Sequence, residues 1–161
     1  VTLVYQALVV DVVKCPPPSR AAWEEDLGDP VTDDQCGRVC ELTKSVASNA
    51  RFKFTYFNFL LRTYLTPVTL RHIDRTRNAG CPRCHQADAT FLHLAWECQQ
   101  VFDFWREVAS CITAATGRLC PAEPRCCLLG NIALPKKKGQ KMICRFIHLA
   151  LVLAKHRVAI T

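Results

Sequence analysis

The chain has 161 residues, of which 50% are hydrophobic and 22% are charged, proportions that exclude a disordered or collagen-like protein. Its length suits a single domain that can bury roughly two-thirds of its unfolded surface. Lys and Arg outnumber Asp and Glu by 21 to 14, and the net charge of +7 favours acidic partners such as nucleic acid, the alternative being a protein that is merely basic.

The first part of the chain predicts a series of short helices. Residues 1–14 are apolar and rich in β-branched side chains, which leaves a buried helix and a strand both open, and the prolines at 16–18 end that element. A helix is expected over residues 20–27. A second is expected over 33–47, because Thr32-Asp33-Asp34-Gln35 has the form of a capping box.

An aromatic helix is expected from about residue 49 to 64, with Ser48 or Asn49 as its cap. Its aromatic residues are Phe52, Phe54, Tyr56, Phe57 and Phe59. Since they point in all directions around a helix, we predict a central, buried helix, the alternative being a base-stacking platform. Thr66-Pro67 then predicts the cap and first residue of a short helix that ends at Ile73.

The second part of the chain also predicts helices. An amphipathic helix is expected over residues 99–115 and ends at Gly117. A loop interrupted by prolines follows, and the last helix is expected over about 139–158. The apolar run at 146–154 is too short to span a bilayer, so we expect no membrane partner.

Cysteine is unusually frequent, with 11 residues. Secreted disulfide scaffolds reach this density, but they are usually shorter and have an even number of cysteines. Because the number is odd and no signal peptide opens the chain, we expect a reducing, intracellular compartment (nucleus or cytoplasm) and no secretion. The chain begins Val-Thr-Leu-Val, and its only methionine is Met142, so we expect a fragment of a longer polyprotein.

The segment from Gly80 to Cys98 carries the most informative motif, C-x2-C-x8-H-x4-C. Its members are Cys81, Cys84, His93 and Cys98. A two-residue gap lets one tight turn aim two thiolates at the same ion, and three thiolates with one imidazole form a closed tetrahedral zinc site of the structural kind. The alternative is four buried side chains without a metal.

Two details refine this motif. Residues five apart do not share a helix face, so His93 or Cys98 is expected at a helix end or a local unwinding. His85 is the rival ligand, which we expect to be a solvent-facing turn residue. Cys36 and Cys40 share a helix face, but no histidine lies near them in sequence, and core packing is expected there.

These motifs occur in an ordered series: Ala22-Trp-Glu-Glu-Asp-Leu-Gly28, Leu60-Leu-Arg-Thr-Tyr-Leu-Thr-Pro-Val-Thr-Leu70, and the cysteine motif through Trp105. The series resembles the carboxy-terminal zinc-binding segment of LINE-type (non-LTR) retrotransposon reverse transcriptases, over roughly residues 20–155. The resemblance implies that the four motif residues bind zinc. It also implies that the partners are the element's RNA or target DNA and the parent polymerase domain.

We therefore predict an all-α fold, a small irregular helical domain with a zinc-knuckle-like CCHC turn. Residues 1–161 would form a single helical unit, with a helical region at 20–78 before the motif and the zinc-binding segment and C-terminal helices at 79–161.

Catalytic motifs of the parent family are missing. Its polymerases hold two magnesium ions with paired aspartates in a Tyr/Phe-x-Asp-Asp turn. The adjacent pair Asp33 and Asp34 has no aromatic residue at the required position, and no endonuclease set is visible. A cysteine nucleophile such as Cys111 with His148 lacks an identifiable acid or oxyanion partner. We expect this chain to have no enzymatic activity.

Two basic clusters are candidates for phosphate contacts. They consist of Arg71, Arg75, Arg77 and Arg83 around the cysteine turn, and of Lys136, Lys137, Lys138 and Lys141 further on. A solvated charged surface is the alternative for both. The predicted function is a non-catalytic zinc- and nucleic-acid-binding segment, and the alternative is a zinc-stabilised structural or protein-interaction module that packs on the parent polymerase.

Overall fold

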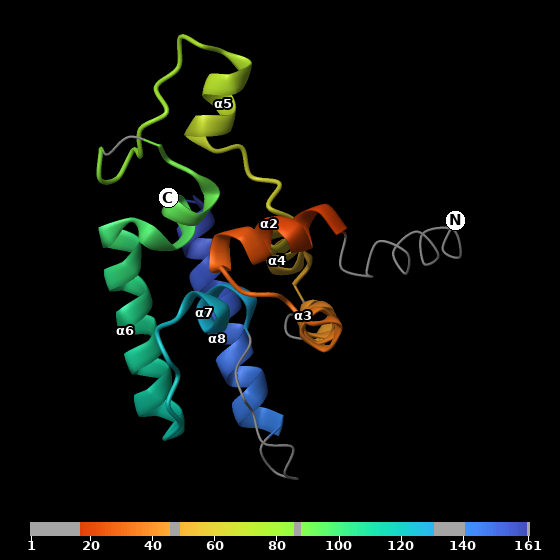
Figure 1. Ribbon diagram of the computed structural model, residues 1–161. Helices are drawn as coiled ribbons and strands as arrows, with labels where there is room; N and C mark the ends of the chain where they lie inside the picture. Colours follow the sequence, from red (N-terminus) through yellow and green to blue (C-terminus); the bar gives the residue numbers. More distant parts are fainter. Residues whose placement is uncertain (1–16, 46–48, 86–87, 131–140, 161) are drawn as a thin grey trace.

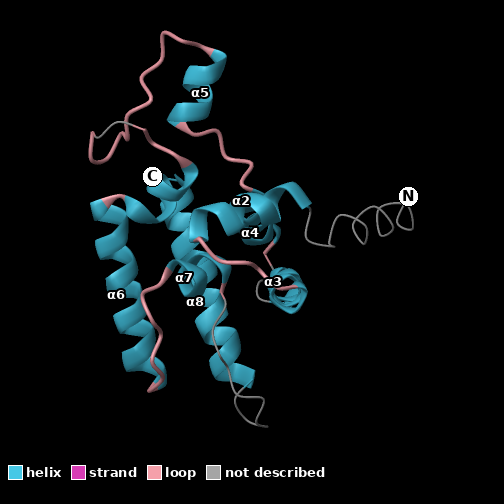
Figure 2. Cartoon of the chain, in the orientation of Figure 1, coloured by secondary structure: helices cyan, strands magenta, loops and turns pink. Residues whose placement is uncertain are grey.

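The computed structural model describes residues 17–45, 49–85, 88–130 and 141–160. Over these ranges the regular elements are helices and no strand occurs (Figures 1 and 2), which confirms the all-α prediction. The elements are α2 (Pro17–Leu27), α3 (Asp33–Ser45), α4 (Ala50–Leu61), α5 (Pro67–Ile73), η1 (His93–Glu97), α6 (Gln99–Thr116), α7 (Pro124–Leu129) and α8 (Lys141–Ile160). The predictions for residues 1–14 and 136–138 lie outside the described residues.

Short-range capping signals set most of the helix ends. Before α3, the backbone N–H of Thr32 donates to Oε1 of Gln35 (2.9 Å), and the N–H of Gln35 donates to Oγ1 of Thr32 (3.3 Å). This reciprocal pair confirms the predicted capping box. The side chains of Asn49 and Thr66 accept backbone N–H groups at the starts of α4 and α5, and α6 ends at Gly117 in the left-handed region (φ 64°).

A cluster of aromatic rings joins α2 and α4 to the segment that enters η1. Trp23 and Phe59 lie 5.6 and 5.2 Å from Phe91 between ring centroids, and Nε1 of Trp23 donates to the carbonyl of Leu60 (2.9 Å). The guanidinium of Arg62 covers the Phe91 ring at 4.8 Å. Aromatic burial and the cation–π contact thus fix the N-terminal helices against the segment that carries the cysteine motif.

The prediction of an aromatic helix buried on most sides holds in part, because Tyr56 and Phe59 are buried and Phe52 and Phe57 are half-buried, but Phe54 is exposed. α4 ends at Leu61, and its Phe54 is 66% exposed. α4 packs one face against α8 and α3, with Oγ1 of Thr55 hydrogen-bonded to Nδ1 of His156 (3.1 Å) and Tyr56 buried. α8, not α4, lies between the N-terminal helices and α6 (Figure 1), and it contacts both α4 and α6.

The C-terminal half supplies the rest of the core. α6 and α8 pack against each other in opposite directions (Figure 1), and Trp105 of α6 is fully buried. The predicted proline-rich loop contains the short helix α7, whose residues 126–129 are all buried. In the part of the chain that the structure describes, no helix combines the length and apolarity needed to cross a membrane.

Candidate metal centre

Two separate turns present the four motif residues. Cys81 and Cys84 lie on the tight turn after α5, closed by a hydrogen bond from the N–H of His85 to the carbonyl of Cys81 (2.9 Å). The base of this loop is held by the N–H of Ala89, which donates to the carbonyl of Ala79 (2.8 Å). The other two ligands, His93 and Cys98, lie at the start and just past the end of η1.

η1 explains how residues five apart reach one site. It is a π-helical turn, in which the N–H of Cys98 donates to the carbonyl of His93 (2.9 Å). An i to i+5 hydrogen bond places the sixth residue over the first, which an α-helical turn does not do. The predicted local departure from α-helix is confirmed. It is a π-helical turn, which is wider than an α-helical turn.

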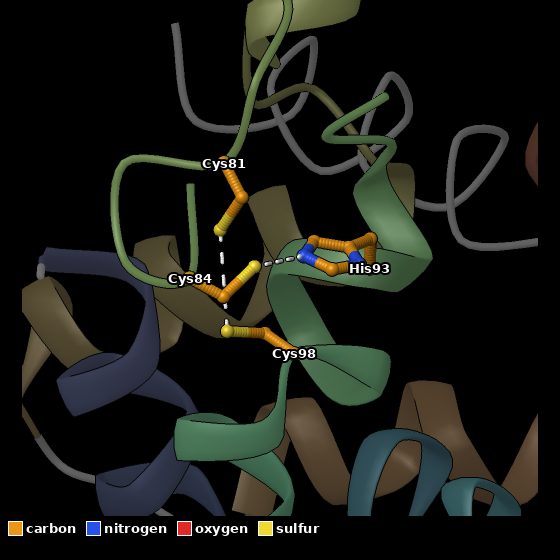
Figure 3. A group of neighbouring side chains, drawn as sticks. All are labelled: Cys81, Cys84, His93 and Cys98. Atoms are coloured by element: carbon orange, nitrogen blue, oxygen red, sulfur yellow. Dashed lines mark hydrogen bonds between the residues drawn. The ribbon is translucent and has the colours of Figure 1, made fainter. Parts of the chain in front are cut away.

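The four ligand atoms form a compact group (Figure 3). Sγ of Cys81 lies 3.9 Å from Sγ of Cys98, Sγ of Cys84 lies 3.3 Å from Nε2 of His93, and all four atoms lie within 4.8 Å of one another. A tetrahedral zinc ion would separate two sulfurs by about 3.8 Å and a sulfur and a nitrogen by about 3.6 Å. The group could therefore hold one metal ion. Three of its members are buried, and Cys84 is half-buried.

The surroundings of Cys81 and Cys98 shift the pKa values of the two thiols in opposite directions. Burial alone would raise the pKa of the Cys81 thiol, but the N–H groups of Arg83 and Cys84 and the His93 side chain outweigh it, and the pKa falls to about 7. Burial raises the pKa of the Cys98 thiol, and the nearby Cys81 adds to this effect. A bound cation would favour the thiolate at both positions and release protons.

Arg83 has a different position from the one predicted. Its guanidinium is half-buried and donates to the carbonyl of Leu94 in η1 (3.0 Å) and to that of Val158 in α8 (2.8 Å). Two of its nitrogens are therefore committed to backbone carbonyls and not presented to a phosphate. The sequence holds no signal for these contacts, because Val158 lies 75 residues away.

The other three arginines lie at the surface beside the cysteine turn. Arg71 is in the last turn of α5, and Arg75 and Arg77 follow it, all exposed. Arg77 lies 3.6 Å from the carboxylate of Asp74. A shallow groove of about 470 Å³ connects this region to the metal centre; it is lined by Pro67, Leu70, Arg77, Asn78, Gly80, Cys81, Pro82 and His85.

His85 fits its predicted place as a solvent-facing residue, exposed and with φ at 60°. The second basic cluster cannot be placed, since residues 136–138 and the side chain of Lys141 lie outside what is described. No known protein-family model matches the chain. Its function must therefore be argued from the metal centre and the surface around it.

The remaining described cysteines are free thiols and form no second group of three metal ligands within the described ranges. Cys36 is buried in α3, as core packing predicts, and Cys111 is exposed on α6. Cys120 and Cys126 lie with their sulfurs 3.7 Å apart in the core, and the hydrogen bond with Cys126, together with burial, raises the pKa of Cys120.

Proposed function

We propose that the chain is a non-catalytic zinc-binding segment that binds nucleic acid, similar to the cysteine-motif segment of LINE-type reverse transcriptases. The observation that carries the proposal is the convergence of three thiols and one imidazole on a single point, next to an exposed row of arginines. The chemistry of the donors supports zinc, since thiolate and imidazole ligands in a closed tetrahedral set are typical of structural zinc sites.

The first test of this proposal is the metal content of the chain. Purified under reducing conditions, the protein should contain one zinc per chain. His93→Ala should lose stoichiometric zinc because it removes one of four ligands. His85→Ala, the matched control eight residues earlier, should retain it. Elemental analysis after gel filtration measures the zinc content of each protein. Zinc loss in both variants, or in neither, would contradict the proposed ligand set.

Nucleic acid is the proposed partner of the surface formed by Arg71, Arg75 and Arg77. Guanidinium groups bind phosphate in bidentate fashion, and the lining of the adjoining groove includes the apolar residues Leu70 and Pro82, which a nucleotide could contact. Binding led by phosphates does not read sequence, and we propose no base-specific contacts. Lys136, Lys137, Lys138 and Lys141 are proposed as a second phosphate-binding cluster, and Arg83 is left out because its guanidinium is engaged elsewhere.

The proposal that the chain is non-catalytic has structural support. Asp33 and Asp34, the one adjacent pair of aspartates, lie exposed in the first turn of α3. Asp33 forms an ion pair with Arg20. Both carboxylates thus stabilise a helix N-terminus, where negative charge is favourable.

RNA titration at two salt concentrations tests the partner. Replacing Arg71, Arg75 and Arg77 together by Ala should weaken binding of a labelled single-stranded RNA by about tenfold and reduce the salt slope by about 2, since each phosphate contact contributes about 0.7. The control removes the same charge elsewhere, by replacing the exposed Arg38, Arg51 and Arg106 with Ala, and should have a much smaller effect.

If the zinc-loaded protein does not bind RNA or DNA even at low salt, the proposal fails. The alternative then stands: a zinc-stabilised structural or protein-interaction module that packs on the parent polymerase. The contacts of Arg83 with η1 and α8 favour that alternative, because they show the cysteine turn already serving to join helices.

A further inference from the structure

α8 carries a second apolar face that the core does not use. Four large side chains spaced at intervals of four, three and four residues form it, and we call them the α8 stripe: Met142, Phe146, Leu149 and Leu153. They are 81%, 49%, 37% and 43% exposed, respectively. This spacing is the seam pattern of helices that pair with another helix, and the stripe extends over about 16 Å of helix.

The stripe is additional to the packing that holds α8 in place. The opposite face of the helix is buried, including Ile147, Leu151 and Val158, and it packs against α4, α6 and α7. The N-terminal turns of α8 extend below α3 and α4 in Figure 1. A row of exposed large apolar side chains is uncommon on a monomeric protein and marks a surface that another molecule covers.

The charges of α8 indicate which molecule fits. Residues 141–160 include no Asp or Glu, and of their four Lys and Arg residues Arg145 and Arg157 are exposed, whereas Lys155 is buried. Arg145 is exposed and immediately precedes Phe146, so it lies at the flank of the stripe. A second copy of this helix would bring two basic surfaces together with no acidic residue on either, whereas acidic side chains on a partner would pair with Arg145.

We propose that the α8 stripe binds an amphipathic helix of another protein, whose apolar seam is flanked by Asp or Glu. The partner helix would place its seam along Met142, Phe146, Leu149 and Leu153, and its acidic flank beside Arg145. This surface is separate from the arginines at the cysteine turn, so the chain could bind nucleic acid and a protein at once.

A pair of synthetic helical peptides tests this proposal on the full, zinc-loaded chain. Both have three heptads with Leu at the seam; one has Glu at the flanking positions and the other has Lys. Fluorescence anisotropy should show binding of the Glu peptide and at least about tenfold weaker binding of the Lys peptide. Arg145→Glu should reverse or abolish this preference.

Two variants locate the site. Phe146→Asp should weaken binding of the Glu peptide at least about tenfold, because a carboxylate would enter the apolar seam. Leu119→Asp is the matched control: it makes the same change in charge at a residue that is 81% exposed but lies outside α8, and it should leave binding unchanged. Circular dichroism and zinc content establish that each variant is folded.

Other results would overturn the proposal. Equal loss of binding in both Asp variants would mean that net charge alone attracts the peptide. A dimer that Phe146→Asp dissociates would identify a second copy as the occupant. Binding to phosphatidylserine vesicles that depends on Phe146, without binding to the Glu peptide, would identify a lipid surface. Absence of binding to all these probes would mean that the stripe is not a docking surface.

Discussion

Lys155 lies in the core of the protein, fully buried, with its Nζ 4.3 Å from the centre of the Tyr56 ring. Burial lowers its pKa from 10.5 to about 7, an effect that the nearby sulfurs of Cys127 and Cys126 only partly oppose. The ring supplies some of the stabilisation that water would give, but an ammonium in an apolar core is still costly. This lysine therefore makes the stability of the fold depend on pH.

The sign of that dependence follows from the direction of the pKa shift. Between pH 7 and 10.5 the unfolded chain holds a proton on Lys155 that the folded chain has lost, so this residue makes stability rise with pH across the window. Lys155→Met should raise the free energy of unfolding at pH 6.5, by on the order of 3 kcal/mol, and by clearly less at pH 9. Urea unfolding of both proteins at the two pH values measures the change in free energy of unfolding that the substitution causes. Because both proteins contain the same cysteines, the titration of the cysteines cancels in this comparison. A difference that is equal at both pH values would contradict the assignment.

At the scale of the elements, Arg83 joins the cysteine turn to two helices, η1 and α8. The guanidinium connects the cysteine turn to η1 and to the end of α8 through two backbone carbonyls. Arg83→Met keeps the length of the side chain but leaves both carbonyls without this donor, and it should lower the free energy of unfolding by about 1–3 kcal/mol. Arg75→Met, at an exposed position in the same loop, should change it by less than about 0.5 kcal/mol. Thermal unfolding of both variants, purified under the same reducing conditions, compares them. Equal effects would place Arg83 among the surface arginines.

The elements also show what sequence can predict. The starts of α3, α4 and α5 and the end of α6 were predictable because capping depends on side chains within three residues, such as Thr32 with Gln35. The four metal-ligand candidates were predictable because their chemistry and spacing are local. The exposure of Phe54 was not, since it depends on which face of α4 packs against α8. The contact from Arg83 to Val158 spans 75 residues, and no local pattern encodes it.

At the scale of the whole molecule, we expect two parts of the fold to respond differently to loss of metal. The α4–α8 contact depends on packing, on the hydrogen bond between Thr55 and His156, and on the buried Tyr56. The segment from the cysteine turn through η1 also packs in the core, through Phe91 and the donation from Nε1 of Trp105 to the carbonyl of Ala95 (2.9 Å), but it carries the four candidate metal ligands as well. A π-helical turn is rare, and here it begins at His93 and is followed by Cys98, two of the four candidate ligands.

Chelation of the metal should therefore loosen one part of the molecule and spare the other. Because the binding energy of a structural metal is largely folding energy, amide hydrogen exchange should speed up at least about tenfold over residues 79–85 and 88–100 when the metal is removed under reducing conditions. Exchange in α4 should change much less, since the hydrogen bond of Thr55 with His156 and the contact of Tyr56 with Lys155 join it to α8 and involve none of the four ligands. His93→Ala should reproduce the pattern without chelator, and His85→Ala should not. Uniform loss of protection would mean that the metal centre stabilises the entire fold, and no change at all would mean that the four side chains are held together by core packing alone.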